Sequence, residues 1–343
     1  MSIAPQHEIH EAIAASIAAH PATARIGQLL AIDRESAGQL LGAMREIAFP
    51  GFHLMGGAEG SAAGTVGGAA GKREGDQRGN GGAARDARDA RDARDARASQ
   101  EHSDIEAFVA ERVPALQLAL TQCIAAAQCA AGGSAIDQHD GTADRIGSEV
   151  LAQIPAIRAA LAADVEAAYR GDPAARSIAE VILCYPGITA LTAHRFAHEL
   201  WIREVPILPR MLAEIAHSAT GIDIHPGAQI GRGVFIDHGT GVVIGETCTI
   251  GEGCRIYQGV TLGAKKFERD ADGSLRKGTK RHPTLGARVT VYAGATILGG
   301  DTVIGDGSVV AGGVFVMQSV PPGHLVANQK AQVRVLPHGE DPA

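Results

Sequence analysis

Aromatic side chains are scarce in this sequence: Phe, Trp and Tyr make up 3% of its 343 residues, and there is a single Trp. An interior with so few rings has to be filled by aliphatic side chains. The 44 glycines suit a backbone that turns sharply and often, because glycine tolerates conformations that are closed to other residues. Together these two features are typical of a β-solenoid, whose interior has room only for aliphatic columns.

Three other shortages exclude whole classes of protein. The net charge of −7 provides no overall basic field for nucleic acid, so an anionic ligand would need a local basic patch. The five cysteines form no Cys-x-x-Cys pair and are odd in number, which argues against a disulfide framework and favours a reducing, cytoplasmic location. Residues 1–20 lack the pattern of a secretory signal, and no run approaches the roughly 18 apolar residues of a membrane span.

Two stretches, residues 1–55 and 103–220, carry helical patterns. In the first, apolar residues share a helical face: Leu40, Leu41, Met44 and Ile47. In the second, Ser103 and Glu106 form a capping-box pair that predicts a helix start, and further apolar runs follow it. We therefore expect N-terminal helices and, after an interruption, a helical domain.

The interruption covers residues 56–102, which are glycine-rich and then run through Ala-Arg-Asp triplets from Ala84 to Arg97. They offer almost no apolar side chains for a core, so we interpret them as a disordered insertion. The alternative for the triplets is a solvated helix, because Ala and Arg favour helix. At the other end of the chain, residues 321–343 are expected to form an extended, loosely held tail.

From Ile222 to about Val316 an aliphatic residue recurs every six residues, with a small residue close behind it. The aliphatic positions are Ile224, Ile230, Ile236, Ile244, Ile250, Ile256, Leu262, Leu285, Val291, Ile297, Ile304, Val310 and Val316. A helix would repeat every three or four residues and a single strand every two. A period of six indicates a solenoid of short strands and corners. The fold class is therefore α+β, an all-helical part followed by a parallel β-helix over residues 221–320.

The six-residue spacing slips after Ile236, after Leu262 and after Ile297. Polar, ionisable residues interrupt the same repeat, and departures from a local rule are where function is expected. They are Asp223, His225, Asp237, His238, Glu246 and the run Lys280-Arg281-His282-Pro283, which closes a loop inserted over residues 263–284. Loops that leave a rigid scaffold often carry function.

These segments, with Tyr169–Ala175 before them and Tyr257–Ala264 after them, resemble serine O-acetyltransferase, the hexapeptide-repeat acyltransferase of bacterial and plant cysteine synthesis. The resemblance covers roughly residues 151–327, and the long loop is similar to that of one large bacterial branch. It implies a left-handed β-helix and homotrimers or dimers of trimers. It also implies transfer of an acetyl group from acetyl-CoA to the hydroxyl of L-serine, giving O-acetyl-L-serine and CoA.

The resemblance assigns the catalytic base to His238 and the carboxylate that orients it to Asp223. Serine's hydroxyl is a poor nucleophile at neutral pH, so an acyltransferase needs a base within hydrogen-bond distance of it. The two residues are 15 positions apart, and a coil of three hexads is about 18 residues long. We expect direct attack on the thioester, because neither Cys248 nor Cys254 lies in a motif typical of an activated nucleophile.

The charges of serine itself call for the rest of its site. Its carboxylate requires a guanidinium, and Arg281 with His282 matches the carboxylate-binding pair of the family. Its ammonium requires carboxylates, and Asp172 and Asp237 match the family positions that hold serine. Because Asp172 precedes the solenoid, the resemblance implies that the helical domain forms one wall of the site.

CoA brings several negative charges to the other side of the reaction. The loop over residues 262–283 holds seven Lys and Arg against three Asp and Glu, a local excess of four positive charges. By resemblance, the residues along CoA are Gly263, Ala264 and Ala293, with Lys265 and Lys280 among its binding residues. Acetyl-CoA is expected as a co-substrate, and no metal is expected.

Three further histidines are interpreted mainly as structural residues. His194 and His198 are four residues apart on an expected helix and could share a metal ion, but such pairs more often serve helix packing or helix surface. His225 is interpreted as structural.

Other functions stay open on the same fold. One is a sugar or nucleotide-sugar acyltransferase, and another is a zinc-dependent carbonic anhydrase, which would need three histidine ligands. A non-enzymatic alternative is a scaffold for the sulfhydrylase that consumes O-acetylserine. The family docks that enzyme through a C-terminal isoleucine, whereas this sequence ends Glu340-Asp341-Pro342-Ala343, so we expect no complex by that route. The resemblance also implies feedback inhibition by L-cysteine, and we expect neither nucleic acid nor membrane as a partner.

Overall fold

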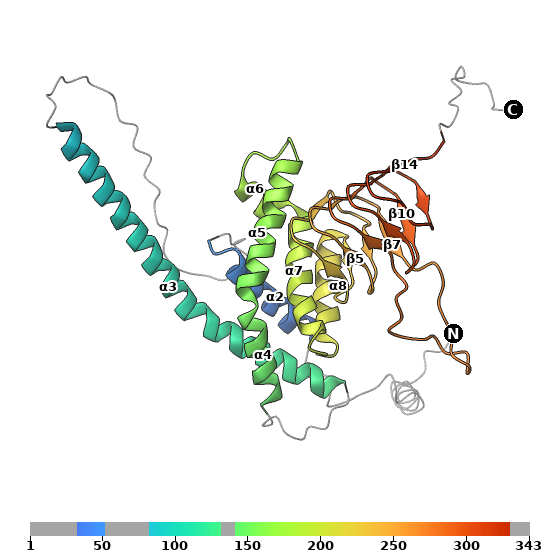
Figure 1. Ribbon diagram of the computed structural model, residues 1–343. Coiled ribbons are helices and arrows are strands. Elements are labelled where there is room, and N and C mark those ends of the chain that lie inside the picture. The colour runs from blue at the N-terminus through green and yellow to red at the C-terminus, as the bar shows by residue number, and fades with distance from the viewer. Residues whose placement is uncertain (1–32, 52–81, 132–140, 330–343) are drawn as a thin grey trace, which may run out of the picture.

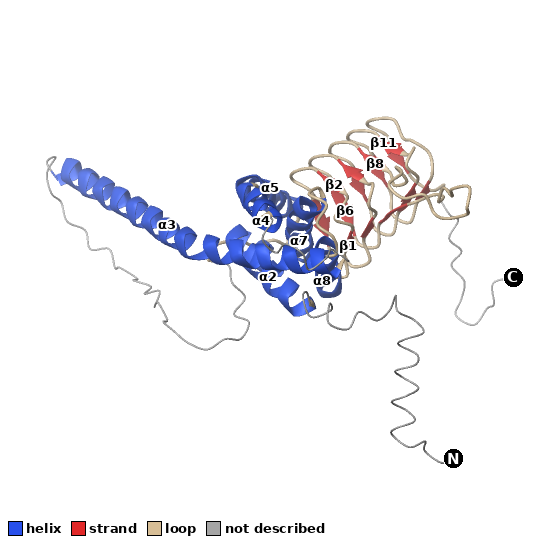
Figure 2. Ribbon diagram, turned by 90° about the horizontal axis from the view of Figure 1, so that it is seen from below, coloured by secondary structure: helices blue, strands red, loops and turns tan. Residues whose placement is uncertain are grey.

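The computed structural model describes residues 33–51, 82–131 and 141–329. Helices form one end of this part of the chain and a stack of short parallel strands forms the other, as Figure 1 shows. Figure 2, seen from below, shows the helices packed against one end of the stack. The expected α+β class, a helical part followed by a left-handed parallel β-helix, is confirmed.

Seven helices are present in the described residues. They are α2 (Arg34–Ala48), α3 (Gly82–Ala130), α4 (Thr142–Ala152), α5 (Ile154–Gly171), α6 (Ile178–Cys184), α7 (Pro186–Trp201) and α8 (Leu208–Thr220). The apolar face predicted for the first of them is real, because Leu40, Met44 and Ile47 are buried. The helix starts at its cap, where the Asp33 carboxylate accepts a hydrogen bond of 2.6 Å from the N–H of Ser36.

Helix α3 corrects two expectations. Residues 82–102 belong to this 49-residue helix and not to a disordered segment, so the helical alternative for the Ala-Arg-Asp triplets holds. Ser103 lies inside the helix and does not begin it. The reason is that Ala and Arg have high helix propensity, which lets the helix extend towards the N-terminus beyond the part that packs. Residues 56–81 of the expected insertion lie outside the described residues.

The prediction about membrane spans also needs a correction. By length and composition, residues Ser103–Ala130 of α3 form a helix that is apolar enough to cross a membrane. Core helices of soluble proteins reach the same length and apolar content, so these two properties alone do not make α3 a membrane span. Within α3, Leu116, Leu120 and Ile124 are buried, and the helix contacts α2 and α4.

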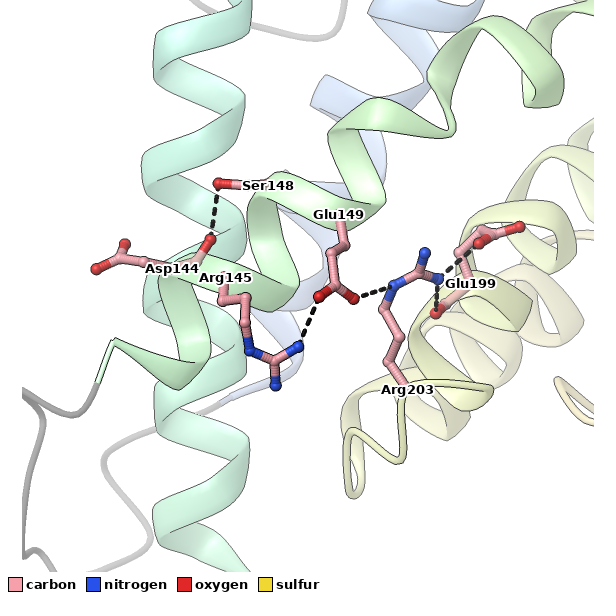
Figure 3. A network of polar contacts seen from close by, with 6 residues as sticks. All are labelled: Asp144, Arg145, Ser148, Glu149, Glu199 and Arg203. Carbon is pink, nitrogen blue, oxygen red and sulfur yellow. Dashed lines mark hydrogen bonds and ion pairs between the residues drawn. The ribbon is translucent and has the colours of Figure 1, made fainter.

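A chain of ion pairs ties α4 to the end of α7, as shown in Figure 3. The Glu149 carboxylate accepts hydrogen bonds from Arg145 at 2.6 Å and from Arg203 at 3.1 Å. Arg203, just beyond α7, also donates to Glu199 at 2.6 Å. The pKa of Glu149 is lowered, chiefly by the hydrogen bond from Arg145. These contacts help to hold the helices together as one block beside the solenoid.

The solenoid has three faces, and each strand pairs in parallel with the next strand on its own face. The first face consists of β1 (Asp223–Ile224), β4 (Val243–Ile244), β7 (Thr261–Gly263), β10 (Thr296–Leu298) and β13 (Phe315–Val316). The second consists of β2 (Gln229–Ile230), β5 (Thr249–Ile250), β8 (Thr284–Leu285) and β11 (Val303–Ile304). The third consists of β3 (Phe235–Asp237), β6 (Arg255–Tyr257), β9 (Thr290–Val291), β12 (Val309–Val310) and β14 (Leu325–Val326).

The predicted aliphatic positions fill the interior of this prism. All are buried except Ile230, which is half-buried. The slips in the period are also real. Val243 pairs with Asp223, 20 residues earlier, whereas Thr261 pairs with Val243 after only 18. The second slip is the loop between β7 and β8. The expected tail is partly wrong, because β14 pairs with β12 and continues the solenoid beyond residue 320.

The helical block meets the solenoid through contacts that leave no room for larger side chains. A side chain at Gly187 in α7 would collide with the carbonyl of Ile236 in β3. One at Gly171, the last residue of α5, would come within 2.8 Å of the Phe235 ring. Beside them the buried Asp164 carboxylate accepts 2.8–2.9 Å hydrogen bonds from Arg195. The end of α5 is thereby fixed against the end of β3.

Candidate active site

A polar turn stands at the corner between β3 and β4, where two extra residues lengthen the coil. Asp237 ends β3, and His238 follows it with a φ of 57°, a conformation that is rare for residues other than glycine. The His238 side chain is 70% exposed, and its Nε2 lies 3.8 Å from an oxygen of Asp237. Strained residues of this kind cluster at functional sites, so this turn is a candidate for the catalytic centre.

Asp172, from the helical block, joins this turn. It caps the C-terminus of α5 and accepts hydrogen bonds from the Tyr185 hydroxyl at 2.5 Å and from the Ala174 N–H at 2.8 Å. These two hydrogen bonds lower the pKa of Asp172, and the nearby His238 lowers it slightly further. Asp172, Tyr185, Asp237 and His238 are called the turn cluster below. The structure therefore brings a residue of the helical block to the corner that holds His238, and its role as one wall of a serine site stays a prediction.

Tyr185 is the member of the turn cluster that the sequence analysis missed. Burial raises its pKa, and the carboxylates of Asp172, Glu180 and Asp237 raise it further, so the hydroxyl stays protonated and remains a donor. Its only local signal is its place before Pro186, between α6 and α7. The hydrogen bond to Asp172 is a tertiary contact, which no spacing in the sequence shows.

Asp223 lies one coil from the His238 turn. The N–H of Gly241 donates to the carbonyl of Gly221 at 2.8 Å, which stacks the two segments. No hydrogen bond or ion pair among the described residues joins Asp223 to His238. Ligand atoms of Glu214, His217 and Asp223 lie within 4.8 Å of one another. The orienting role of Asp223 therefore stays a prediction.

A second group of polar residues lies at the corner between β4 and β5, where the end of the inserted loop returns to the solenoid. Glu246, Thr247, Lys280, Arg281 and His282 form this group, which is called the loop cluster below. Arg281 pairs with the Glu246 carboxylate. Nδ1 of His282 accepts a 3.1 Å hydrogen bond from the Thr247 N–H, and Lys280 donates to the Thr247 carbonyl at 2.6 Å.

His282 is held as a neutral ring. Burial, helped by the neighbouring Arg281, lowers its pKa to about 4. The ring lies so close to Gly245 that any side chain there would collide with it. His225, near the same cluster, also has a pKa of about 4, mainly because of burial, and its Nδ1 accepts the N–H of Gly227 at 3.0 Å. This local contact fits the structural role expected for His225.

The structure thus divides the predicted serine-binding residues into two sets. Asp172 and Asp237 are in the turn cluster, at the corner between the third and first faces. Arg281 and His282 are in the loop cluster, at the corner between the first and second faces. No hydrogen bond or ion pair joins the two clusters within the part of the chain that the structure describes.

Basic side chains of the inserted loop surround a cavity of about 300 Å³. Its lining includes Lys265, Lys266, Lys280 and Arg281, together with the acidic residues Glu268 and Asp301. Arg276 of the same loop is already engaged, since it lies 3.0 Å from Asp270 and 3.6 Å from Glu268. Four of the seven basic side chains of the loop therefore line this cavity, against two acidic ones.

The small residues expected along CoA lie on or beside the first face. Gly263 ends β7 and pairs with Leu298, and Ala264 follows it into the loop. Ala293 lies at the opposite edge of that face, at the corner that precedes β10. Next to it, Tyr292 stacks on Tyr257 with ring centroids 5.1 Å apart.

The two solenoid cysteines are unsuited to nucleophilic catalysis. Burial raises the pKa of Cys248 to about 12 and that of Cys254 to about 11. At neutral pH neither holds a useful fraction of thiolate. Direct transfer without an acyl-cysteine stays a prediction.

His194 and His198 lie on α7 and line a cavity of about 500 Å³ between the helices and the solenoid. Burial lowers the pKa of His194 well below its usual value, and its Nδ1 has no hydrogen-bond partner among the described residues. Nδ1 of His198 lies 2.8 Å from the carbonyl oxygen of Pro226. These surroundings favour packing over metal binding for the pair.

Sequence similarity to proteins of known family decides which family this chain belongs to. A serine acetyltransferase of Helicobacter pylori is 46% identical over 172 residues, which are 50% of this chain and 95% of that protein. The chain belongs to the serine acetyltransferase family. The family pattern described as "Serine acetyltransferase, N-terminal" matches residues 130–193. The plasmid serine acetyltransferase of Synechococcus elongatus is 54% identical over 181 residues, 53% of this chain.

The match to some relatives is partial. The chain spans 56% of the length of that Synechococcus protein and 51% of the length of a Synechocystis serine acetyltransferase. Among solved structures, serine acetyltransferase 1 of Entamoeba histolytica, in complex with L-cysteine, has a TM-score of 0.63 and 32% identity over 84% of this chain and 86% of that chain. Isoform 3 from the same organism, also with cysteine, has a TM-score of 0.56 and 38% identity over 66% of this chain and 74% of that one.

Proposed function

We propose that this member of the serine acetyltransferase family transfers the acetyl group of acetyl-CoA to the hydroxyl of L-serine, giving O-acetyl-L-serine and CoA. The observation that carries the proposal is the turn cluster. It brings two carboxylates and an exposed histidine from the helical block and the solenoid to one corner. That arrangement can bind an ammonium group and accept a hydroxyl proton beside it.

His238 is the general base of the proposed reaction. Its ring is open to solvent and can approach an incoming hydroxyl. As the serine oxygen attacks the thioester carbonyl, the ring takes the hydroxyl proton. The carbon–sulfur bond then breaks, and the same proton can pass to the departing sulfur of CoA. Asp223 is proposed to orient His238, and the raised pKa values of Cys248 and Cys254 support direct transfer.

Serine is proposed to bind both clusters at once. Asp172 and Asp237 would hold its ammonium group, and Arg281 with His282 would hold its carboxylate. Because these pairs lie at different corners of one solenoid, a site made from both requires neighbouring copies of the chain. This supports the homotrimer or dimer of trimers that the sequence resemblance implies.

CoA is proposed to lie along the first face and to end at the loop. Gly263, Ala264 and Ala293 would allow the backbone to approach the pantetheine arm. Lys265 and Lys280, which line the 300 Å³ cavity, would meet the phosphates. No metal takes part in this proposal.

The regulatory and cellular parts of the proposal rest on the family. The Entamoeba relatives were solved with cysteine, and feedback inhibition by L-cysteine is proposed here on that likeness. A cytoplasmic location is proposed from the unpaired cysteines. Residues 330–343 lie outside the described part of the chain.

The proposal is tested by following CoA release from acetyl-CoA with L-serine, with no acceptor and with a sugar acceptor. Release that depends on L-serine and is suppressed by micromolar L-cysteine is the expected result. Release only with the sugar would reject the serine proposal in favour of a sugar acyltransferase. Zinc analysis of the purified protein tests the carbonic anhydrase alternative. That alternative requires three histidines, whereas the group of three candidate ligands found among the described residues contains one.

A further inference from the structure

Thr247, to which neither the sequence resemblance nor the proposed function gives a role, contacts three consecutive residues of the loop. Its hydroxyl oxygen accepts the backbone N–H of Arg281 at 3.0 Å and that of His282 at 3.1 Å. Its own N–H donates to Nδ1 of His282 at 3.1 Å, and its carbonyl accepts Lys280 at 2.6 Å. One residue at the corner between β4 and β5 therefore anchors the returning end of the loop.

The same contacts fix the tautomer of His282. The Thr247 oxygen also lies 2.9 Å from Nδ1 of the ring. Since that oxygen already accepts two N–H groups, its own proton is left to point at Nδ1. Two donors facing Nδ1 keep it unprotonated, so the proton of the neutral ring is on Nε2. Nε2 forms no hydrogen bond within the described part of the chain, which leaves it to a ligand.

We infer that Thr247 is the positioning residue that makes this site select acceptors with a carboxylate. It sets the His282 ring with Nε2–H as a donor and fixes the backbone from which Arg281 extends. The acceptor's carboxylate then binds the charged guanidinium of Arg281 and the neutral Nε2–H of His282, which points in a fixed direction. The inference rests on the proposed function for its acceptor, L-serine, and concerns a residue that does not itself touch the substrate.

The chemistry of the side chain at position 247 separates positioning from simple packing. Thr247→Val keeps the size of the side chain and the hydrogen bonds of the Thr247 N–H and C=O, but it removes the hydroxyl oxygen. The backbone N–H groups of Arg281 and His282, and the His282 ring, then lose a hydrogen-bond partner. Thr247→Ser keeps the oxygen and loses only a methyl group. Thr290→Val, at the start of β9 on the third face, is a matched control for replacing a solenoid threonine.

The test compares kcat/KM for L-serine with that for L-serinamide, which lacks the carboxylate, in the wild-type chain and the three variants. For Thr247→Val we expect the preference for L-serine to fall about tenfold. The loss should appear in KM for L-serine, with kcat and KM for acetyl-CoA nearly unchanged. Thr247→Ser should restore the preference, and Thr290→Val should match the wild type.

Several outcomes overturn the inference. It fails if Thr247→Val lowers kcat/KM equally for both acceptors, or if Thr247→Ser behaves like Thr247→Val. Thermal melting of each variant excludes misfolding as a cause. If the wild-type chain releases no CoA with L-serine, the proposed function fails by itself. Calorimetric binding of L-serine and L-serinamide to the same variants then decides the inference, and absence of any L-serine binding to the wild type rejects both.

Discussion

His238 combines features that support a catalytic role at the scale of one residue. Its backbone is in the left-handed region, with a φ of 57°, and Gly239 continues in the same region with 78°. For a residue with a Cβ this conformation costs roughly 1–2 kcal/mol. The rest of the coil offsets this free-energy cost. It does so at the turn where the coil is two residues longer and where the His238 imidazole is 70% exposed. A coil of regular length would lack the turn that exposes this side chain.

Replacing His238 with Ala should lower kcat for serine-dependent CoA release by about 10²- to 10⁴-fold, the usual contribution of a general base. KM for acetyl-CoA and the melting temperature should stay close to those of the wild type, because the side chain is largely exposed. His324→Ala, a change at an exposed histidine elsewhere in the solenoid, is the control and should be silent. A near-normal kcat for His238→Ala would assign the base to another group.

Replacing Tyr185 with Phe tests the support behind Asp172. The variant removes the largest cause of the low pKa of Asp172, so that pKa should rise towards its usual 3.8. An NMR titration of the carboxyl group can measure this rise. At pH 7 the carboxylate stays ionised in both proteins, but it is less firmly held. We therefore expect KM for L-serine to rise about fivefold with little change in kcat.

The stability linked to Asp172 has a defined direction. Because the folded-state pKa is depressed, the stabilisation is present above about pH 3.8 and is lost as the pH falls through the folded-state pKa. In Tyr185→Phe this stabilisation should be smaller, and its loss should be complete at a higher pH, because the folded-state pKa lies closer to 3.8. Tyr169→Phe, at a 38% exposed tyrosine of α5, is the matched control. If both variants gave the same KM as the wild type, Tyr185 would have no part in holding the site.

At the scale of elements, the inserted loop should determine affinity for acetyl-CoA. Changing Lys265 and Lys266 to Ala should raise KM for acetyl-CoA about tenfold at low salt, because two charges that line the cavity are lost. The effect should shrink as salt is added, and KM for L-serine should change little. Lys277→Ala removes a charge from the same loop outside the cavity lining and should stay within twofold. If each of the three lysines changed KM for acetyl-CoA equally, the loop would attract acetyl-CoA by its overall charge and not through a binding site.

Helix α3 should matter for packing only over its second half. Deleting residues 56–97 should leave turnover and the melting temperature nearly unchanged, because the buried residues Leu116, Leu120 and Ile124 all lie beyond the deletion. Extending the deletion through residue 120 removes two of them and should lower the melting temperature sharply. Loss of activity in the shorter deletion would show that the removed segment supports the enzyme.

The elements also show what a sequence can predict. The period of six predicted the interior of the solenoid from Ile224 to Val316, because each inward residue depends only on its own corner and strand. The slip after Ile236 marked the turn of His238 for the same local reason. Tyr185 and Thr247 were missed because their contacts join segments far apart in the chain, to Asp172 and to the residues before Pro283. The length of α3 was missed because composition suggested disorder, whereas helix propensity prevails.

The arrangement of the whole molecule separates two halves of one proposed site. The solenoid is rigid, since each coil bonds to the next along three faces. A flexing of the chain therefore cannot bring the turn cluster at one corner to the loop cluster at another. A cyclic assembly of copies can do so without any change of shape, because it places one corner of each solenoid against a different corner of its neighbour. Each complete site would then take the ammonium-binding half from one chain and the carboxylate-binding half from the next.

Mixing two inactive variants tests this arrangement directly. His238→Ala destroys the half at the turn, and Arg281→Ala destroys the half at the loop, so each pure variant should be almost inactive. If the halves come from neighbouring chains, random co-assembly of equal amounts makes about a quarter of the sites from two intact halves. Denaturing and refolding the two variants together should therefore restore about a quarter of wild-type turnover, whereas mixing them after separate refolding should not. If both halves belonged to one chain, every site would keep one damaged half, and the mixture would stay as inactive as its components.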